Sequence, residues 1–230
     1  MTHKRSDLPS TPAPLMRKSP HQARAALTIE IIFEAAAQIL QVDGLAGLTT
    51  NRVAEHAGYS VGTLYQYFKN KESLLLAMAM HEADGVARTL DALFDAASQQ
   101  TPEDTLRATV RIWINFFGGR QQVQRLVMQA VIDNPEYAQF HKRVIELADQ
   151  LSHRLAQLPA SYPLTESRKF VLSRALVGIV RSGVLESSPL LHEQPLQEDL
   201  VWLLRTMLYA QCETCHIANC TPCAKGSERE

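Results

Sequence analysis

From Ala25 onward, apolar residues recur at three- and four-residue spacing, and this period constrains the fold more than any other feature of the sequence. The first periodic segment ends near Gly44, which we expect to close a helix with a left-handed cap. No segment shows the sustained alternation of apolar and polar residues that marks a half-buried strand. The sequence therefore predicts an all-α fold. The first helix has apolar positions at Leu27, Ile31, Ile32, Ala35, Ala36 and Leu40.

Proline and glycine indicate where the following helices end. We expect about eight more helices, separated by short segments that contain one or both of these residues. Their expected ranges are 50–57, 61–68, 71–98, 102–118, 121–132, 136–158, 165–186 and 195–213.

The net charge of the chain is -1, but the charge is unevenly distributed. The first 24 residues hold five basic side chains against Asp7, so they carry +4 and the rest of the chain carries -5. A basic arm on an acidic body can contact phosphate groups, and a solubilising tail is the alternative. Four prolines among the first 20 residues predict that this arm is disordered. The basic residues are Lys4, Arg5, Arg17, Lys18 and Arg24.

Neither a signal peptide nor a membrane span is expected. The first 20 residues lack the apolar core of a signal peptide. No stretch reaches the roughly 18 uninterrupted apolar residues that a spanning helix needs. We therefore predict a cytoplasmic protein with no membrane partner.

The strongest local pattern covers residues 48–74, LTTNRVAEHAGYSVGTLYQYFKNKESL. Thr50 is expected to cap a short helix, and Gly58 lies where a tight turn needs a positive φ angle. Ser60 is expected to cap the helix that follows. Two short helices joined by a glycine-containing turn predict a helix-turn-helix.

The second of these helices has one apolar face, formed by Leu64 and Phe68, and one polar face. Such a helix is slim enough to enter a DNA major groove, where outward hydroxyl, amide and basic groups can contact phosphates or base edges. Lys71 adds a cation at the start of the next helix, whose N-terminal dipole favours phosphate. Packing of the two tyrosines and of Val61 inside the small domain is the alternative.

The run AGYSVGTLYQYF over 57–68, followed by KESL over 71–74, resembles the signature of the TetR family of repressors. The resemblance covers about residues 27–75 without a gap. It implies DNA contacts at the positions of Thr50, Asn51, Val61, Gly62, Thr63, Tyr65, Tyr67 and Lys71. The helical geometry adds three further candidates, Arg52, Ser60 and Gln66.

The same resemblance implies a C-terminal helical domain for ligand binding and dimerisation. The expected helix over 71–98 would join the DNA-contacting Lys71 to that domain, so it is a candidate lever between the two. The expected segments are a disordered basic arm over 1–24, a helix-turn-helix DNA-binding domain over 25–70, a ligand-binding and dimerisation domain over 71–211, and a cysteine-rich tail over 212–230.

In the family, two C-terminal helices of each subunit form a four-helix dimer interface. We expect helices 165–186 and 195–213 to form it here, with close approach at Gly178, Ser182 and Gly183; burial of both helices inside the monomer is the alternative. An aromatic cluster marks a candidate effector pocket, although such clusters also occur in ordinary cores. The candidate pocket residues are Trp113, Phe116, Phe117, Met128, Tyr137 and Phe140.

All four cysteines lie in the last 19 residues as two C-x-x-C pairs, Cys212 with Cys215 and Cys220 with Cys223. This is the spacing of a four-thiolate metal site, so we predict a zinc ion there, with an iron–sulfur cluster as the alternative occupant. A thiol redox switch and a tail of functionally silent cysteines are the alternatives. The C-x-x-C-H pattern ending at His216 also matches haem attachment, which the expected cytoplasmic location disfavours.

The function that these patterns favour is a ligand-responsive, dimeric transcription regulator. We expect a repressor that binds a palindromic operator in double-stranded DNA and is released by a small-molecule effector. A metal-binding or redox-sensing protein that acts through the cysteines is the alternative. The sequence holds no nucleophile–base motif, phosphate-binding glycine loop or metal-hydrolase signature, so we expect no enzyme and no required cofactor.

Overall fold

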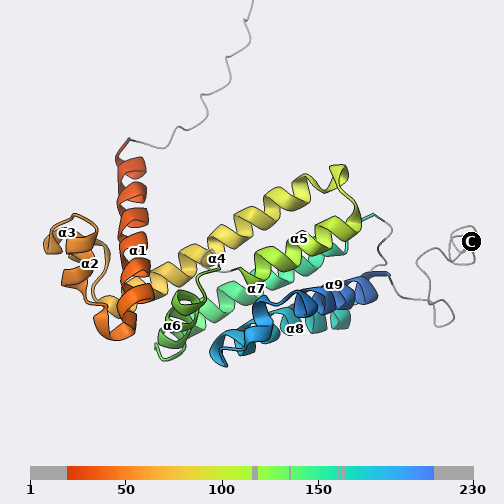
Figure 1. Cartoon of the computed structure of the whole chain (residues 1–230). Helices are drawn as coiled ribbons and strands as arrows, with labels where there is room; N and C mark the ends of the chain where they lie inside the picture. The colour runs from red at the N-terminus through yellow and green to blue at the C-terminus, as the bar shows by residue number, and fades with distance from the viewer. Residues whose placement is uncertain (1–19, 116–118, 135, 160, 162–163, 210–230) are drawn as a thin grey trace, which may run out of the picture.

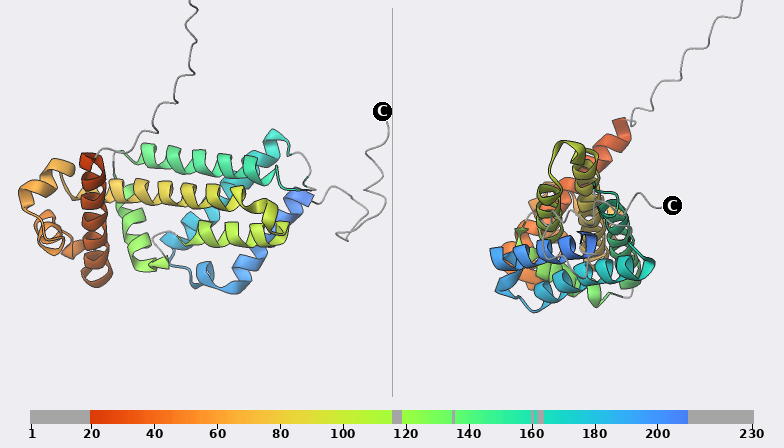
Figure 2. Two further views of the ribbon diagram at one scale, coloured as in Figure 1. Left: turned by 90° about the horizontal axis from the view of Figure 1, so that it is seen from above. Right: turned by 90° about the vertical axis from the view of Figure 1, so that its right-hand side faces the viewer.

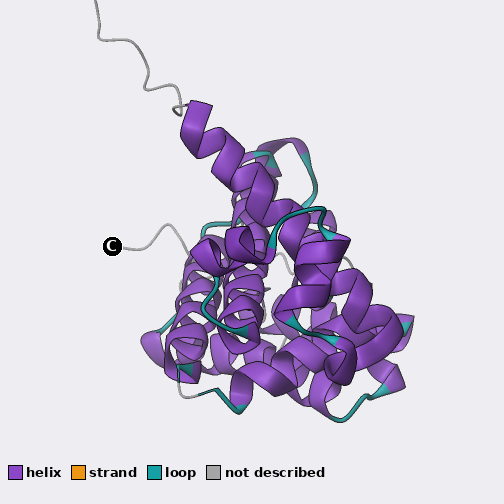
Figure 3. Ribbon diagram, turned by 90° about the vertical axis from the view of Figure 1, so that its left-hand side faces the viewer, coloured by secondary structure: helices purple, strands orange, loops and turns teal. Residues whose placement is uncertain are grey.

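The computed structural model describes residues 20–115, 119–134, 136–159, 161 and 164–209. Within these ranges all regular structure is helical, as predicted (Figure 3). The helices are α1 (Pro20–Gly47), α2 (Thr50–His56), α3 (Val61–Tyr67), α4 (Lys71–Asp95), α5 (Pro102–Ile114), α6 (Gln121–Ile132), α7 (Tyr137–Leu155), α8 (Glu166–Leu185) and α9 (Gln194–Tyr209), with two short 3-10 helices, η1 (Ala97–Gln99) and η3 (Pro189–His192).

Polar side chains cap most of these helices at their N-termini. The side-chain oxygens of Ser60, Asn70, Thr101 and Thr165 each accept a hydrogen bond from a backbone N–H in the first turn of α3, α4, α5 and α8. Such a cap typically contributes about 1 kcal/mol of stability. The prediction that Thr50 caps α2 is wrong. Thr49 is the cap there, because its extended backbone lets its hydroxyl accept from Arg52 N at 3.2 Å.

A glycine with a positive φ sets the geometry at the end of α1. Gly44 adopts a φ of 66° and kinks the end of α1, so the chain turns where the sequence predicted, although helical hydrogen bonding resumes as far as Gly47. The kink brings Leu48 back under α1, where it is buried. The start of α2 is thereby fixed against α1.

The helices form two groups, with α4 running from one into the other (Figures 1 and 2). Helices α1 to α3 gather at one end of the molecule, α5, α6 and α7 pack against the rest of α4, and α8 and α9 pack on those three helices. Its inner face is apolar throughout, from Leu74 and Leu75 at its start to Val86 and Leu90 further along. The long helix that the sequence predicted over 71–98 ends slightly earlier, at Asp95.

A second connection between the two groups comes from the N-terminal turn of α6. The guanidinium of Arg120 donates two hydrogen bonds to the Glu34 carboxylate on α1, both at 3.1 Å. Gln122 donates to the backbone carbonyl of Leu40 at 3.3 Å. These bonds join residues more than 80 positions apart, so α6 holds α1 directly as well as through α4.

The apolar faces of α8 and α9 are largely buried within the monomer. Leu200, Leu204 and Leu208 of α9 are at most 3% exposed, and Leu172 and Leu176 of α8 are equally covered. Burial inside the monomer was the alternative to an interface, and it applies to these side chains. Gly183 likewise faces its own chain, since a Cβ there would meet Leu191 of η3 at 3.1 Å.

One described helix, over 24–47, is long and apolar enough to cross a membrane by length and composition. Glu30 and Glu34 interrupt the apolar run of this helix, so it does not contain the uninterrupted apolar stretch expected of a membrane span. Both carboxylates face protein groups, with Glu30 near His81 at 3.2 Å and Glu34 bound to Arg120. We interpret α1 as the central helix of the N-terminal group.

Candidate nucleic-acid interface

The turn between α2 and α3 has the geometry that its glycine predicts. Gly58 adopts a φ of 72°, and its N–H donates to the Glu55 carbonyl at 3.1 Å. The next N–H, that of Tyr59, donates to the Ala54 carbonyl at 2.9 Å. A side chain at a positive φ would be strained, so glycine allows the chain to leave α2 and enter α3 at a fixed angle.

The buried face of α3 determines which residues point outward. Leu64 is fully buried and Phe68 is 6% exposed, as the four-residue spacing predicted. The Phe68 ring packs against Phe33 of α1, with ring centroids 5.7 Å apart. Val53 and Ala54 of α2 complete this small core. The orientation of α3 is therefore set by apolar contacts on one side only.

The opposite face of α3 is open. Tyr65 is 52% exposed, Val61 38% and Tyr67 37%. Gly62 and Gln66 are exposed as well, while Thr63 is half-buried. The alternative that the two tyrosines and Val61 pack inside the domain does not describe this structure. A helix face of this width, with hydroxyl and amide groups, can approach another surface closely.

Two hydroxyl pairs hold the polar groups of this face in position. Tyr65 Oη lies 3.2 Å from Thr50 Oγ1 at the start of α2. Ser60 Oγ lies 2.8 Å from Thr63 Oγ1, and it also accepts from Thr63 N at 3.0 Å. Each pair uses one of its two hydroxyl hydrogens. The other hydrogen of each pair can be donated to an anion such as a phosphate oxygen.

The Arg52 guanidinium is directed back toward the end of α1. It donates to Asp43 Oδ2 at 2.6 Å and to the Gly47 carbonyl at 3.0 Å. These bonds brace the kinked end of α1 against α2. A DNA contact by Arg52 stays a prediction, and the guanidinium keeps further N–H donors beyond these two bonds.

Two lysines flank the cap of α4. Lys71 is the first residue of α4 and is exposed, as the prediction requires, and Lys69 is exposed two residues before it. Between them, Asn70 and Ser73 form a reciprocal capping box. The sequence argument overlooked Lys69 and Asn70, although a lysine on each side of an asparagine before a helix was a readable signal. Cations beside a helix N-terminus form a site suited to an anion.

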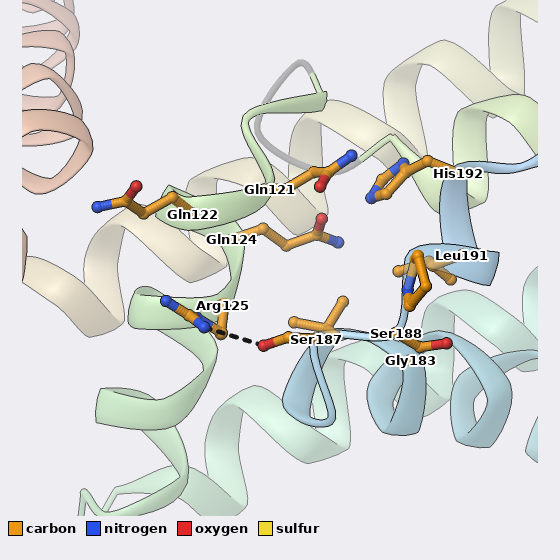
Figure 4. A pocket seen from close by; sticks show the side chains of 11 residues that line it. Gln121, Gln122, Gln124, Arg125, Gly183, Ser187, Ser188, Leu191 and His192 are labelled. Atoms are coloured by element: carbon orange, nitrogen blue, oxygen red, sulfur yellow. Dashed lines mark hydrogen bonds between the residues drawn. The ribbon is translucent and has the colours of Figure 1, made fainter.

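The predicted pocket residues lie in the other half of the molecule. Trp113, Met128 and Phe140 line a cavity of about 40 Å³ between α5, α6, α7 and α8. Phe116 and Phe117 lie outside the described residues, and the side chain of Tyr137 is not described. A larger cavity of about 320 Å³ lies between α6, the end of α8 and η3 (Figure 4). Gln124 lines both cavities, and the sequence argument did not single it out.

The predicted metal ligands Cys212, Cys215, Cys220 and Cys223 all lie outside the described residues. Within the described ranges, no group of three or more His, Cys, Asp or Glu side chains is placed to hold a metal ion.

The N-terminal helices match a protein family. The family model for bacterial regulatory proteins of the tetR family matches residues 32–78, which include α2, α3 and the first turns of α4. All eleven predicted DNA-binding residues lie inside this range.

Curated relatives match over parts of their length. The HTH-type transcriptional regulator EthR of Mycolicibacterium smegmatis is 30% identical over 112 residues, 47% of this chain and 50% of that protein. The nucleoid occlusion factor SlmA of Actinobacillus pleuropneumoniae is 28% identical over 138 residues, 59% of this chain and 66% of that one. The class D tetracycline repressor protein of Escherichia coli is 41% identical over 56 residues, 24% of this chain and 26% of that protein. The chain thus spans less than two thirds of each relative.

Solved structures share the fold over most of their length. The fatty acid degradation regulator FadR of Bacillus halodurans superposes with a TM-score of 0.59 at 17% identity, covering 84% of this chain and 97% of that chain. The multidrug binding protein EbrR complexed with malachite green gives a TM-score of 0.54 at 19% identity, covering 79% and 98%. At these identities the likeness shows the fold alone.

Proposed function

The chain belongs to the tetR family of bacterial regulatory proteins, and from that premise we propose that it is a ligand-responsive dimeric repressor of transcription. The observation that carries the proposal is the outer face of α3. Leu64 and Phe68 fix the helix through its buried face, while exposed hydroxyl and amide groups cover the opposite face. A groove-reading helix needs both properties. The relatives are named as regulators and repressors, and the proposal extends that role to this chain.

The proposed contacts divide into two classes. Hydroxyls of Tyr65 and Tyr67, with Lys71, are suited to phosphate oxygens and would position the protein. Asn51 and Gln66 end in amides that can bond to base edges and would carry sequence specificity. We include Lys69 as an additional phosphate contact because it is exposed beside Lys71.

The proposed dimer uses apolar side chains that the monomer leaves exposed on its last helices. Phe170, Val171 and Leu185 of α8 are 60%, 52% and 37% exposed, and Trp202 of α9 is 56% exposed. Gly178 lies on the same helix with no neighbouring atom within 4 Å of a Cβ built there. A two-fold interface through these groups would place two α3 helices on one DNA duplex, whose operator would then be palindromic.

The proposed effector site is the pair of cavities that Gln124 separates. The first turn of α6 has two roles in this arrangement. Gln121, Gln124 and Arg125 line the outer cavity, while Arg120 and Gln122 hold α1. A ligand that moves this turn would change how α1 to α3 sit on α4. Its effect on DNA affinity is limited to its differential affinity for the two arrangements, typically about 1–3 kcal/mol.

A selection experiment tests the proposed function. Purified protein is used to select duplexes from a random pool, and the enriched sequence is then tested by gel shift against a scrambled duplex. A palindrome bound by two protomers is the expected result. Enrichment of no common sequence, or binding that does not distinguish the scrambled duplex, would overturn the proposal. We propose that the protein acts in the cytoplasm and by binding rather than by catalysis.

The cysteine tail supports a second candidate function, a metal or redox sensor. The motivating observation is that Cys212, Cys215, Cys220 and Cys223 form two C-x-x-C pairs and that the first 211 residues contain no cysteine. One zinc ion per chain in elemental analysis of tag-free protein is the expected result. Less than about a tenth of an equivalent after anaerobic zinc reconstitution, with four freely reactive thiols, would exclude the metal site.

A further inference from the structure

The strongest unexplained feature of the molecule is the side chain of Gln124. It is 1% exposed, yet neither its amide nitrogen nor its amide oxygen has a hydrogen-bond partner. Leaving a buried polar group unpaired is destabilising, and here the donor and the acceptor of one amide are both left unpaired. Figure 4 shows the side chain extending from α6 toward η3, between Gln121 and Arg125. The side chain thus lines both cavities, while its two amide atoms are closed to solvent in the free protein.

The two cavities on either side of Gln124 differ in chemistry. The inner one is lined mainly by apolar side chains, including Trp113, Phe140 and Val180. The Trp113 indole N–H is bonded to the Leu176 carbonyl at 3.2 Å, so its ring offers an apolar surface. The outer cavity is lined mostly by polar groups, and its volume of about 320 Å³ lies in the range of small-molecule sites.

The charges around these cavities restrict the ligand further. Neither cavity has a carboxylate in its lining, so a cationic group would find no counter-ion there. Arg125 of the outer cavity donates to Ser187 Oγ at 2.9 Å. Burial lowers the pKa of His192, so this side chain is neutral at pH 7 and offers one donor and one acceptor. A cationic head group beside the buried Gln124 would therefore lose its hydration and also face the positive charges of Arg125 in the outer cavity and Arg181 in the inner one.

We propose that Gln124 is the anchor of the effector site and that it selects an uncharged, amide-like head group on a ligand with a short apolar end. A carboxamide or lactam has an N–H donor beside a C=O acceptor. It can therefore form two reciprocal hydrogen bonds with the Gln124 amide, while its apolar end enters the inner cavity. A carboxylate satisfies only the nitrogen and opposes the oxygen; an ammonium does the reverse. This inference rests on the proposed function and names the chemical class of the effector.

The test compares three probes that share a propyl group and differ in the head group: butanamide, butanoate and n-butylammonium. Each is titrated into full-length protein labelled with ¹⁵N at glutamine side chains, up to about 10 mM. The Gln124 amide resonances are identified by their absence in Gln124→Leu. Gln129→Leu is the matched control, because Gln129 lies on the same helix but is exposed and lines neither cavity.

The expected result is a shift of the Gln124 resonances with butanamide and an affinity for it at least about tenfold above that for the other two probes. Gln124→Leu should lose about tenfold in butanamide affinity, whereas Gln129→Leu should change less than about twofold. Because leucine leaves no unpaired polar atom, Gln124→Leu should fold. Equal binding of the three probes, equal affinity in Gln124→Leu, or no binding of butanamide would each overturn the inference. The proposed function fails separately, if the selected DNA is not bound.

Discussion

Polar side chains cap helices in both the helix-turn-helix region and the C-terminal bundle, but the two regions differ in how their other polar groups are paired. In the first, short polar side chains such as Thr49, Ser60 and Asn70 close helix ends, and the outward hydroxyls are held in pairs. In the second, Gln124 is buried with both amide atoms unpaired beside two cavities. We infer that the DNA-facing surface is preorganised in the free protein. In the bundle, by contrast, a bound ligand would satisfy the unpaired polar atoms.

The largest effect should come from charge placed in the bundle core. Leu204 is fully buried, so Leu204→Glu should destabilise the monomer by at least about 4 kcal/mol and unfold it rather than simply separate a dimer. Trp202→Glu, two residues earlier on the exposed side, should separate the dimer and leave the monomer folded. Sedimentation and circular dichroism measure the two outcomes. A folded monomer in the Leu204 variant would place that side chain in the interface after all.

A kink in α4 should separate the two regions without unfolding either. Gly85→Pro removes a helical hydrogen bond and costs about 3 kcal/mol, so DNA binding and ligand binding should persist while ligand-driven DNA release is lost. Gly85→Ala is the matched control, since a Cβ there meets only the end of the Arg88 side chain at 3.8 Å. It should keep release and add up to about 1 kcal/mol of stability. Intact release in the proline variant would exclude α4 as the transmitter.

Loss of a single hydroxyl should weaken DNA binding measurably. Tyr65→Phe removes one proposed phosphate bond and the pairing with Thr50, and the affinity for the selected duplex should fall about fivefold, or about 1 kcal/mol. Tyr59→Phe is the control, because Tyr59 is half-buried in the turn before α3 and its hydroxyl bonds Thr28 of α1 at 3.5 Å. Fluorescence anisotropy should distinguish them, and equal affinities would remove Tyr65 from the interface.

The smallest effect on stability, and the most specific, concerns the contact between α6 and α1. The Arg120 hydrogen bonds, with one from Gln38, hold the pKa of the Glu34 carboxyl below its usual range. The contribution of the ionised Glu34 carboxylate to the free energy of unfolding is therefore present at neutral pH. It is lost as the pH falls below about 4.5 and through the lowered pKa. Glu34→Gln should cost less than about 1 kcal/mol but should reduce ligand-driven release and remove this acid dependence. Unchanged release in Glu34→Gln would assign the coupling to α4 alone.

The same comparison explains what the sequence could predict. The helix-turn-helix could be predicted because it depends on local properties, the four-residue spacing of Leu64 and Phe68 and the positive φ of Gly58. The N-terminal cap of α2 was misplaced by one residue because Thr49 and Thr50 are chemically alike. In the bundle, periodicity predicted the helix over 195–213 but not what its apolar face would contact, so this helix was assigned to the dimer interface although its Leu204 is buried in the monomer. The burial of Gln124 and the pairing of Arg120 with Glu34 depend on contacts between distant segments, which no local pattern encodes.

The salt dependence of binding to the selected duplex tests the central claim most directly, because it counts phosphate contacts. The slope of log affinity against log salt is measured for wild type, Lys71→Ala and Lys142→Ala; Lys142 is an exposed lysine on α7, remote from α3. The account predicts that Lys71→Ala lowers the magnitude of the slope by about two units in the dimer, one per subunit, and that Lys142→Ala leaves it unchanged. Equal slopes for all three proteins would contradict a DNA interface at α3 and the start of α4.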